Sequence, residues 1–138
     1  MTNVYFLDAC ALLATFKEEI GYITVADLYA KAEKGELSLR INIVNLLEVF
    51  YGLVYDFGLE FSEKRLSEVT NSSVEITNLS LPTLKEAARF KTTYKISLAD
   101  SIVLAETSVS NGTIITSDHH EMDIVEQNES HIKFLWIR

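Results

Sequence analysis

The sequence predicts an α/β domain built on a mostly parallel sheet, and three observations support that fold class. Short apolar stretches of strand length alternate along the chain with longer segments whose apolar residues recur at helical spacing. Hydrophobic residues make up 48% of the 138 residues, which suffices for one buried core, and there is no repeat, linker or low-complexity tract. We therefore expect residues 1–138 to form a single domain, in which right-handed crossovers place helices on both faces of the sheet.

The first part of the chain alternates strand and helix twice. The apolar stretch that ends at Leu7 indicates a short buried strand, and a helix begins at once after Asp8, which places Asp8 at the carboxyl end of a strand. A second helical pattern is ended by Gly35. The elements expected here are strands at residues 4–7 and 37–41 and helices at residues 9–16 and 24–34.

The middle of the chain predicts a pair of helices followed by a strand. Asn42 or Asn45 can cap a long apolar helix, with Gly58 beyond its end, and a second helix forms the return arm. The elements expected here are helices from residue 42 or 45 to about 55 and from 62 to about 71, and a strand at residues 74–77.

The last part of the chain carries two clear helix starts. Ser80 can cap a helix whose favoured first position is taken by Pro82, the only proline, and Ser97 can cap the next helix. The turn Asn111-Gly112 ends the second of these helices. The elements expected here are helices from residue 80 to about 94 and from 97 to about 110, and strands at residues 113–116 and 132–137.

The net charge of -8, from 20 acidic and 12 basic residues, limits the classes of function. Broad nucleic-acid binding draws its affinity from lysine and arginine, so any contact with nucleic acid should be local. The excess of acids fits either carboxylates around a metal ion or an acidic groove for a basic partner segment. No apolar run reaches the ~18 to 20 residues that cross a bilayer, and the start lacks the basic region of a signal peptide, so we expect a cytoplasmic protein.

Four carboxylates have apolar neighbours in the sequence. Asp8, Glu48 and Asp100 are each the only charged residue in an apolar stretch, and Asp118 follows the apolar run GTIITS. Burying a carboxylate is costly unless it is paired or holds a cation, and few bases lie close in sequence to pair with these four. A bound divalent metal is the simplest explanation.

The predicted topology can bring these acids together. Asp8 and Asp118 each follow a strand, while Asp100 and Glu48 lie on helices that start at the same edge of the sheet. Ligands that offer only oxygen select a hard cation such as Mg²⁺ or Mn²⁺, which can activate water and stabilise charge on a phosphodiester. The expected reaction is therefore metal-assisted phosphodiester hydrolysis.

Some of these residues also have plain structural explanations. Asp100 can be the acidic member of a capping box, and Asp118 can be a turn residue or a helix cap. The lone cysteine, Cys10, is expected to be packed, because a catalytic thiol needs a nearby base. His119 and His120 make a poor zinc pair, since neighbouring residues of a helix point about 100° apart and no HExxH motif or cysteine set accompanies them.

Three segments carry a resemblance to a known family, namely FLDACALL, IVNLLEVFYG and ISLADSIVLAETSVSNGTIITSD. With the spacing of their acids, they resemble the PIN domain, especially the VapC-type ribonuclease toxins of bacteria and archaea, over nearly the whole chain. The resemblance implies a three-layer α/β/α fold with a mostly parallel five-stranded sheet. It also implies a Mg²⁺- or Mn²⁺-dependent endoribonuclease in which Asp8, Asp100 and Asp118 bind metal and Glu48 positions a metal or the attacking water.

The resemblance extends to supporting residues and partners. Asn45 and Thr116 would be hydrogen-bonding residues behind the four acids. Members of this type are commonly dimers and are inhibited by a small DNA-binding antitoxin whose tail enters the acidic site, which suits an acidic chain. After Asp118 the segment HHEMD departs from the commonest pattern, so the roles of Glu121 and Asp123 stay open.

Basic and aromatic residues near these motifs have two interpretations each. A basic stretch before Asp100 can steer an RNA backbone to the site or form a solvated helix face. The aromatic residues of the long helix can belong to the core or meet a second subunit. The possible RNA contacts are Arg89, Lys91, Lys95 and His119.

Two other doubly wound classes fail at particular positions. A haloacid-dehalogenase-like phosphatase needs a second aspartate where this chain has Cys10, and a response-regulator receiver needs an aspartate where it has Thr77 and Asn78. Two alternatives within the same fold stay open. One is a non-catalytic PIN-like binding module, and the other is a housekeeping nuclease that processes RNA.

Overall fold

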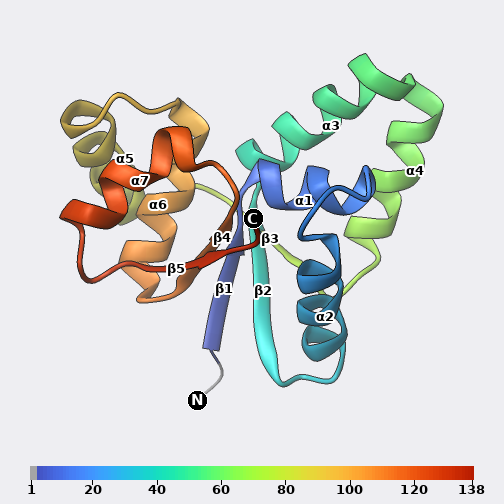
Figure 1. The fold of residues 1–138 in the computed structure, drawn as a ribbon, viewed down its shortest axis with the longest axis horizontal. Coiled ribbons are helices and arrows are strands. Elements are labelled where there is room, and N and C mark those ends of the chain that lie inside the picture. Colours follow the sequence, from blue (N-terminus) through green and yellow to red (C-terminus); the bar gives the residue numbers. More distant parts are fainter. Residues whose placement is uncertain (1–2) are drawn as a thin grey trace.

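The computed structural model describes residues 3–138, which form a five-stranded sheet between two layers of helices (Figure 1). The strands are β1 (Asn3–Leu7), β2 (Leu37–Asn42), β3 (Glu75–Thr77), β4 (Thr113–Thr116) and β5 (Lys133–Trp136). The helices are α1 (Ala9–Phe16), α2 (Tyr22–Glu33), α3 (Ile43–Phe57), α4 (Leu59–Thr70), α5 (Leu81–Thr93), α6 (Leu98–Ser110) and α7 (His119–Asn128). The three-layer α/β fold predicted from the sequence is confirmed.

The strand order is β3-β2-β1-β4-β5, and every neighbouring pair is parallel. β1 lies at the centre, where Tyr5 pairs with Leu39 on one side and with Thr113 on the other. The chain places β2 and β3 outward from β1 and then returns across the sheet to add β4 on the other side of β1. This reversal creates a topological switch point at the carboxyl ends of β1 and β4, where α/β sheets bind their ligands.

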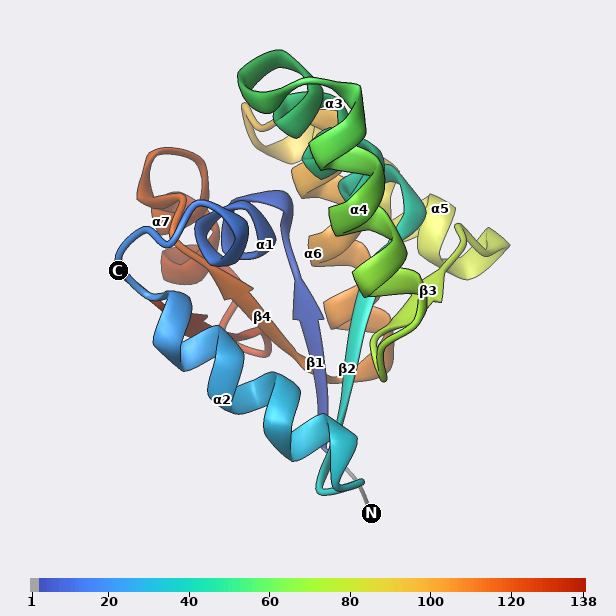
Figure 2. The ribbon, with the colours of Figure 1, turned by 90° about the vertical axis from the view of Figure 1, so that its right-hand side faces the viewer.

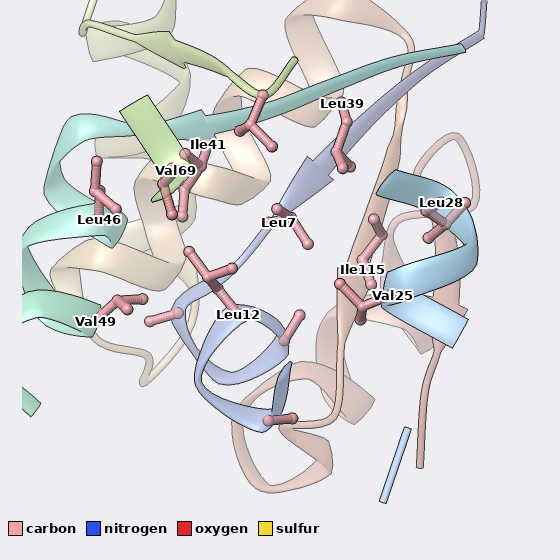
Figure 3. Close-up of a cluster of buried hydrophobic side chains, with 14 of the residues drawn as sticks. Leu7, Leu12, Val25, Leu28, Leu39, Ile41, Leu46, Val49, Val69 and Ile115 are labelled. Carbon is pink, nitrogen blue, oxygen red and sulfur yellow. The ribbon is translucent and has the colours of Figure 1, made fainter. Parts of the chain in front are cut away.

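Each face of the sheet has its own buried apolar cluster, because successive residues of a strand point to opposite faces. Leu7 and Ile115 belong to the cluster shared with α1, α2, α3 and α4, which Figure 3 shows in close-up. Their neighbours in sequence, Phe6 and Ile114, belong to the cluster shared with α5, α6 and α7. Figure 2 views the sheet from the side of α2 and α4. Both faces are therefore covered, as predicted for a parallel sheet.

Two helices begin earlier than the sequence pattern indicated. α2 begins at Tyr22 and not at residue 24, and α4 begins at Leu59 and not at Ser62. In both cases a glycine with positive φ occupies the position before the helix, Gly21 at 99° and Gly58 at 86°. Glycine supplies a turn here that an apolar periodicity cannot reveal.

Two further details differ from the expectation. The sequence left open whether Asp118 is a turn residue or a helix cap, because the segment after it includes few apolar residues. The structure shows that Asp118 caps a ten-residue helix, α7. Pro82 takes the second helical position of α5, one residue later than expected, since Leu81 is the first. None of the helices within residues 3–138 is long and apolar enough to cross a membrane.

Candidate active site

The carboxyl ends of β1 and β4 lie side by side, and an aspartate follows each of them. Asp8 comes directly after β1, and its amide donates to the carbonyl of Ile115 on β4 at 3.2 Å. Asp118 comes two residues after β4 ends at Thr116. The helices that follow, α1 and α7, leave toward opposite faces of the sheet (Figure 1). The two carboxylates therefore share the switch point of the fold.

Asp8 is buried at the junction of β1 and α1, with 1% of its surface exposed. It caps α1, because its Oδ1 accepts a hydrogen bond of 2.8 Å from the Ala11 amide. Its other oxygen, Oδ2, is buried and has no partner with hydrogen-bond geometry within residues 3–138. Burial raises the pKa of Asp8 to about 7, against the lowering effect of the Thr116 hydroxyl and the Ala11 amide. The charges of Asp118 and Glu48 also contribute to this rise of the pKa.

Thr116 and Asp118 connect the end of β4 to the start of α7. The Asp118 amide donates to Thr116 Oγ1 at 3.0 Å, and Asp118 Oδ1 accepts from the Glu121 amide at 3.2 Å. Thr116 is fully buried and its hydroxyl also acts on the Asp8 carboxylate. Thr116 therefore contacts both aspartates, as a positioning residue would.

Asp100 reaches the same place from the first turn of α6. It is 8% exposed, and its amide donates to the hydroxyl of Ser97, the N-cap of the helix, at 3.1 Å. On the other side, the buried Asn45 of α3 donates from Nδ2 to the carbonyl of Ala99 at 3.3 Å. The capping-box alternative for Asp100 is wrong, because the Ser97 amide donates to Glu121 instead, at 2.8 Å.

Glu121 joins this group, although the sequence left its role open. One side-chain oxygen from each of Asp100, Asp118 and Glu121 lies within 4.8 Å of the others. Glu121 is the third residue of α7, and a residue three positions after the cap lies on the same side of the helix as the cap. The three-residue spacing between Asp118 and Glu121 could have indicated that they share a site. The same segment also contains two histidines and Asp123, so the spacing alone did not single out Glu121.

A hydrogen bond joins the carboxyl groups of Asp100 and Glu121. Burial, this hydrogen bond and the charge of Asp8, in that order, together raise the pKa of Asp100 to about 9. The same hydrogen bond lowers the pKa of Glu121. Without a cation, the group therefore keeps a proton on Asp100 at neutral pH.

Glu48 lies on α3 at the edge of this cluster and is half-buried. Burial raises its pKa, and so do the charges of Glu121 and Asp118, while a hydrogen bond from the Tyr51 hydroxyl lowers it. The electrostatic influence of Glu121 and Asp118 indicates that Glu48 faces the same cluster. The structure thus brings all four acids expected from the sequence to one edge of the sheet.

The donors in this cluster fit a hard divalent cation. All of them are carboxylate oxygens, and Asp8 Oδ2 is a buried oxygen that a cation would satisfy. The nearest soft donor, the thiol of Cys10, has its pKa raised to about 12, first by burial and then by the surrounding acids, so it stays protonated. Mg²⁺ or Mn²⁺ suits such a set better than Zn²⁺.

The basic residues expected near the site differ in their surroundings. Arg89 is bound to carboxylates on two sides, to Glu86 at 2.7 Å and to Glu129 at 2.8 Å. Its guanidinium is therefore occupied, and this arrangement does not support a contact with RNA. Lys91 donates to the carbonyl of Ile96 at 2.6 Å, just before the start of α6, and Lys95 is exposed beside it.

His119 and Asp123 form a separate contact on the outer side of α7. The His119 ring stacks on Trp136, with centroids 3.8 Å apart, and its Nδ1 lies 2.7 Å from Asp123 Oδ1. Asp123 is exposed and pairs with this histidine, so it is not part of the acidic cluster that Glu121 joins.

Comparisons with known proteins agree on the fold. The sequence model of the PIN domain matches residues 5–126. VapBC2 from Rickettsia felis bound to a DNA fragment from its promoter has a TM-score of 0.72 at 18% identity, covering 96% of this chain and 98% of that chain. VapBC-1 from nontypeable Haemophilus influenzae has a TM-score of 0.72 at 16% identity, covering 97% of this chain and 98% of that chain.

A third structure and a second search complete the comparison. VapC20 from Mycobacterium tuberculosis, a toxin that cleaves the sarcin-ricin loop, has a TM-score of 0.66 at 12% identity, covering 90% of this chain and 95% of that chain. A search of curated proteins gives no match. At these identities, the solved structures establish a similar fold.

Proposed function

Because this chain belongs to the PIN domain family, we propose that it is a metal-dependent endoribonuclease and the toxin of a VapBC-type toxin-antitoxin pair. The observation that carries the proposal is the buried Asp8, whose Oδ2 has no partner inside the described part of the chain and which lies among three other carboxylates. Such a site is unfavourable without a cation and favourable with one. The structural similarity to VapC20, a toxin that cleaves RNA, supports RNA as the substrate class.

The roles of the side chains follow from their placement. Asp8, Asp100 and Asp118 would hold Mg²⁺ or Mn²⁺. When bound, the ion supplies positive charge at the scissile phosphate and lowers the pKa of a coordinated water. Glu48, which is half-buried and has a raised pKa, would orient the attacking water and accept its proton.

Supporting residues hold this arrangement in place and receive the substrate. Asn45 fixes the first turn of α6 through the Ala99 carbonyl, and Thr116 holds the acids that follow β1 and β4. Lys91, in the last turn of α5, and the exposed Lys95, which precedes α6, would contact the RNA backbone, and the exposed His119 would contact the RNA from α7. The small number of free bases agrees with a contact confined to the region of the cut.

The partners of the proposed toxin suit the surface around the site. A small DNA-binding antitoxin with a basic tail would be attracted to the acidic edge, and two of the similar structures are VapBC proteins bound to DNA. The exposed apolar side chains of α3, with Leu47 at 57% and Tyr55 at 85% exposure, would pack against a second copy of the chain.

The test is cleavage of a mixed pool of tRNA and rRNA by purified protein with Mg²⁺, with Mn²⁺ and with EDTA. We expect discrete fragments that require metal, and we expect Asp8→Asn to lower the rate by about a hundredfold or more, because the variant loses a charged ligand. Asp27→Asn is the matched control, since Asp27 is exposed on α2 and forms its salt bridge with Lys31 of the same helix. Normal cleavage by Asp8→Asn would refute the site. Intact RNA in every lane, from folded and metal-loaded protein free of any partner, would favour the non-catalytic binding module.

A further inference from the structure

Three aromatic rings, from Phe134, Trp136 and His119, form a stack beside the acidic site. Phe134 and Trp136 lie on the same face of β5, with ring centroids 5.5 Å apart and planes within 13° of parallel. Both rings pack against the buried cluster shared with α5, α6 and α7. The ring of His119 lies on Trp136, with centroids 3.8 Å apart and planes 10° from parallel, and it extends the stack to the surface.

The stack lies at the edge of the sheet that carries the acids. Trp136 is the last residue of β5 and pairs with Thr116, the last residue of β4. His119 directly follows Asp118, so the Cα atoms of these two residues are about 3.8 Å apart. Neighbouring residues of a helix point about 100° apart, so the His119 ring lies beside the carboxylates and does not point among them.

Both nitrogens of the His119 ring already have partners. Nδ1 lies 2.7 Å from Asp123 Oδ1, and Nε2 lies 2.8 Å from the main-chain oxygen of Arg138. The side chain is nevertheless 49% exposed. Because Trp136 covers one face of the ring, the exposed part is mainly the opposite face. His119 therefore offers a substrate a flat aromatic surface, while its nitrogens are engaged elsewhere.

The charges around the stack favour an uncharged partner. The carboxylate of Asp123 is bonded to His119, and the carboxylate of Glu126 accepts a hydrogen bond from Trp136 Nε1 at 3.1 Å. These charges repel a phosphate group, and they act only weakly on an uncharged base. The same hydrogen bonds fix the two rings before a ligand arrives, which reduces the entropy lost on binding.

We propose that the open face of His119 binds one unpaired base of the RNA by stacking, next to the phosphate on which the acids act. This inference rests on the proposed function and adds a contact that favours single-stranded RNA, because the bases of a duplex are already stacked on one another. Every base has a flat π face, so the contact accepts any of the four bases. The alternative interpretation is that His119 only covers Trp136.

The test uses single-stranded oligonucleotides of about twelve nucleotides that span a cut found in the tRNA and rRNA pool. In a series of these oligonucleotides, the bases on either side of the cut are removed one at a time, and the sugar-phosphate backbone is kept. The measured quantity is kcat/KM for cleavage in Mg²⁺. Thermal unfolding of each protein variant confirms that the compared proteins are folded.

We expect His119→Leu to lower kcat/KM for the complete oligonucleotide about tenfold, because the variant loses the stacking surface. Removal of one particular base should lower the wild-type value by a similar factor and should not lower the value of His119→Leu any further. His119→Phe keeps a flat ring and loses both nitrogen contacts, so it should cleave nearly as well as the wild type. His131→Leu is the matched control, since His131 is 52% exposed and precedes the other end of β5.

Three results would overturn the inference and leave the nuclease standing. In the first, His119→Leu cleaves every oligonucleotide as fast as the wild type. In the second, the losses from His119→Leu and from base removal multiply at every position, so that His119 acts on no base. In the third, a folded His119→Phe loses as much activity as His119→Leu, so that the nitrogen contacts matter and the flat ring does not. If the wild type cuts no RNA in the pool, the proposed function fails, and this inference fails with it.

Discussion

Asp8 shows at the scale of one residue how a functional site opposes stability. Its Oδ1 stabilises the fold by capping α1. Its Oδ2 is buried and has no hydrogen-bond partner in residues 3–138. Burial is the main reason that its pKa is raised to about 7. Ionisation of Asp8 is therefore less favourable in the folded than in the unfolded state, and it lowers the free energy of unfolding. A cation would remove that cost, and so would loss of the charge.

This leads to a prediction about stability and pH in the metal-free protein. Below the ordinary pKa of 3.8, Asp8 is protonated in both states and costs nothing; the cost grows between pH 3.8 and 7 and is complete above it. Asp8→Asn keeps the cap, so in EDTA at pH 8 it should be more stable than the wild type by about 2 to 4 kcal/mol. Urea unfolding at pH 8 and at pH 4 checks this. An Asn variant that is less stable at pH 8, or equally stabilised at both pH values, would contradict it.

The residues of the site were predictable to the extent that they stand out from their neighbours. Asp8, Glu48 and Asp100 are single charges in apolar stretches, and such a pattern is costly unless it has a function. Glu121 lies in a polar segment where several side chains could do the same work, so its part depends on the side-chain direction that the Ser97 amide imposes. Only the folded structure supplies that contact.

At the scale of elements, the caps and turns determine where each helix starts. The starts marked by Ser80 and Ser97 agree with the sequence, because the capping side chain is itself the signal. For α3 the sequence offered Asn42 or Asn45, and the structure uses Asn42. The predicted starts of α2 and α4 were two or three residues too late. At both starts a glycine with positive φ makes the turn, and the sequence contains no capping side chain that would indicate it. Gly21 is the more constrained of these, since a Cβ there would lie 2.4 Å from the carbonyl oxygen of Ile137.

Gly21→Ala should therefore cost more stability than a glycine substitution that meets only backbone strain. Gly35→Ala is the comparison, because Gly35 also has a positive φ, 75°, but a Cβ there would meet nothing within 4 Å. We expect a loss of about 1 to 2 kcal/mol for Gly35→Ala and clearly more for Gly21→Ala, since the contact with Ile137 adds to the strain. Chemical denaturation of both variants is the measurement. Equal losses would mean that the end of the chain moves aside freely.

At the scale of the whole molecule, the site is assembled from both sides of the sheet. Asp8 caps α1 and Glu48 lies on α3, and these helices pack in one buried cluster. Asp100 lies in the first turn of α6 and Asp118 caps α7, and these helices pack in the other cluster. Four carboxyl groups, with Glu121 beside them, meet between these halves in a chain whose net charge is already -8. The repulsion between them acts across the switch point of the sheet.

Metal binding should consequently stabilise the entire domain. A ligand present at a hundred times its dissociation constant adds about 2.7 kcal/mol, so millimolar Mn²⁺ should raise the Tm by several degrees, and EDTA should return it to the starting value without unfolding the protein. Differential scanning calorimetry tests this, with the double variant Asp8→Asn, Asp100→Asn expected to show no response. If Mn²⁺ does not change the Tm of the wild type, the acids do not bind the metal.

The position of β1 at the centre of the sheet has a consequence for the synthesis of the protein. β1 is made first, yet its pairing with β4 must wait until Thr113 and the residues after it have been translated. Pairing between strands so distant in sequence is slow to form, and the early part of the chain folds without it. Asp118 is also translated only after β4. The four carboxylates therefore cannot come together while the ribosome is still making the first hundred or so residues. In the proposed nuclease, the cutting site would assemble only after β4 and Asp118 have been translated.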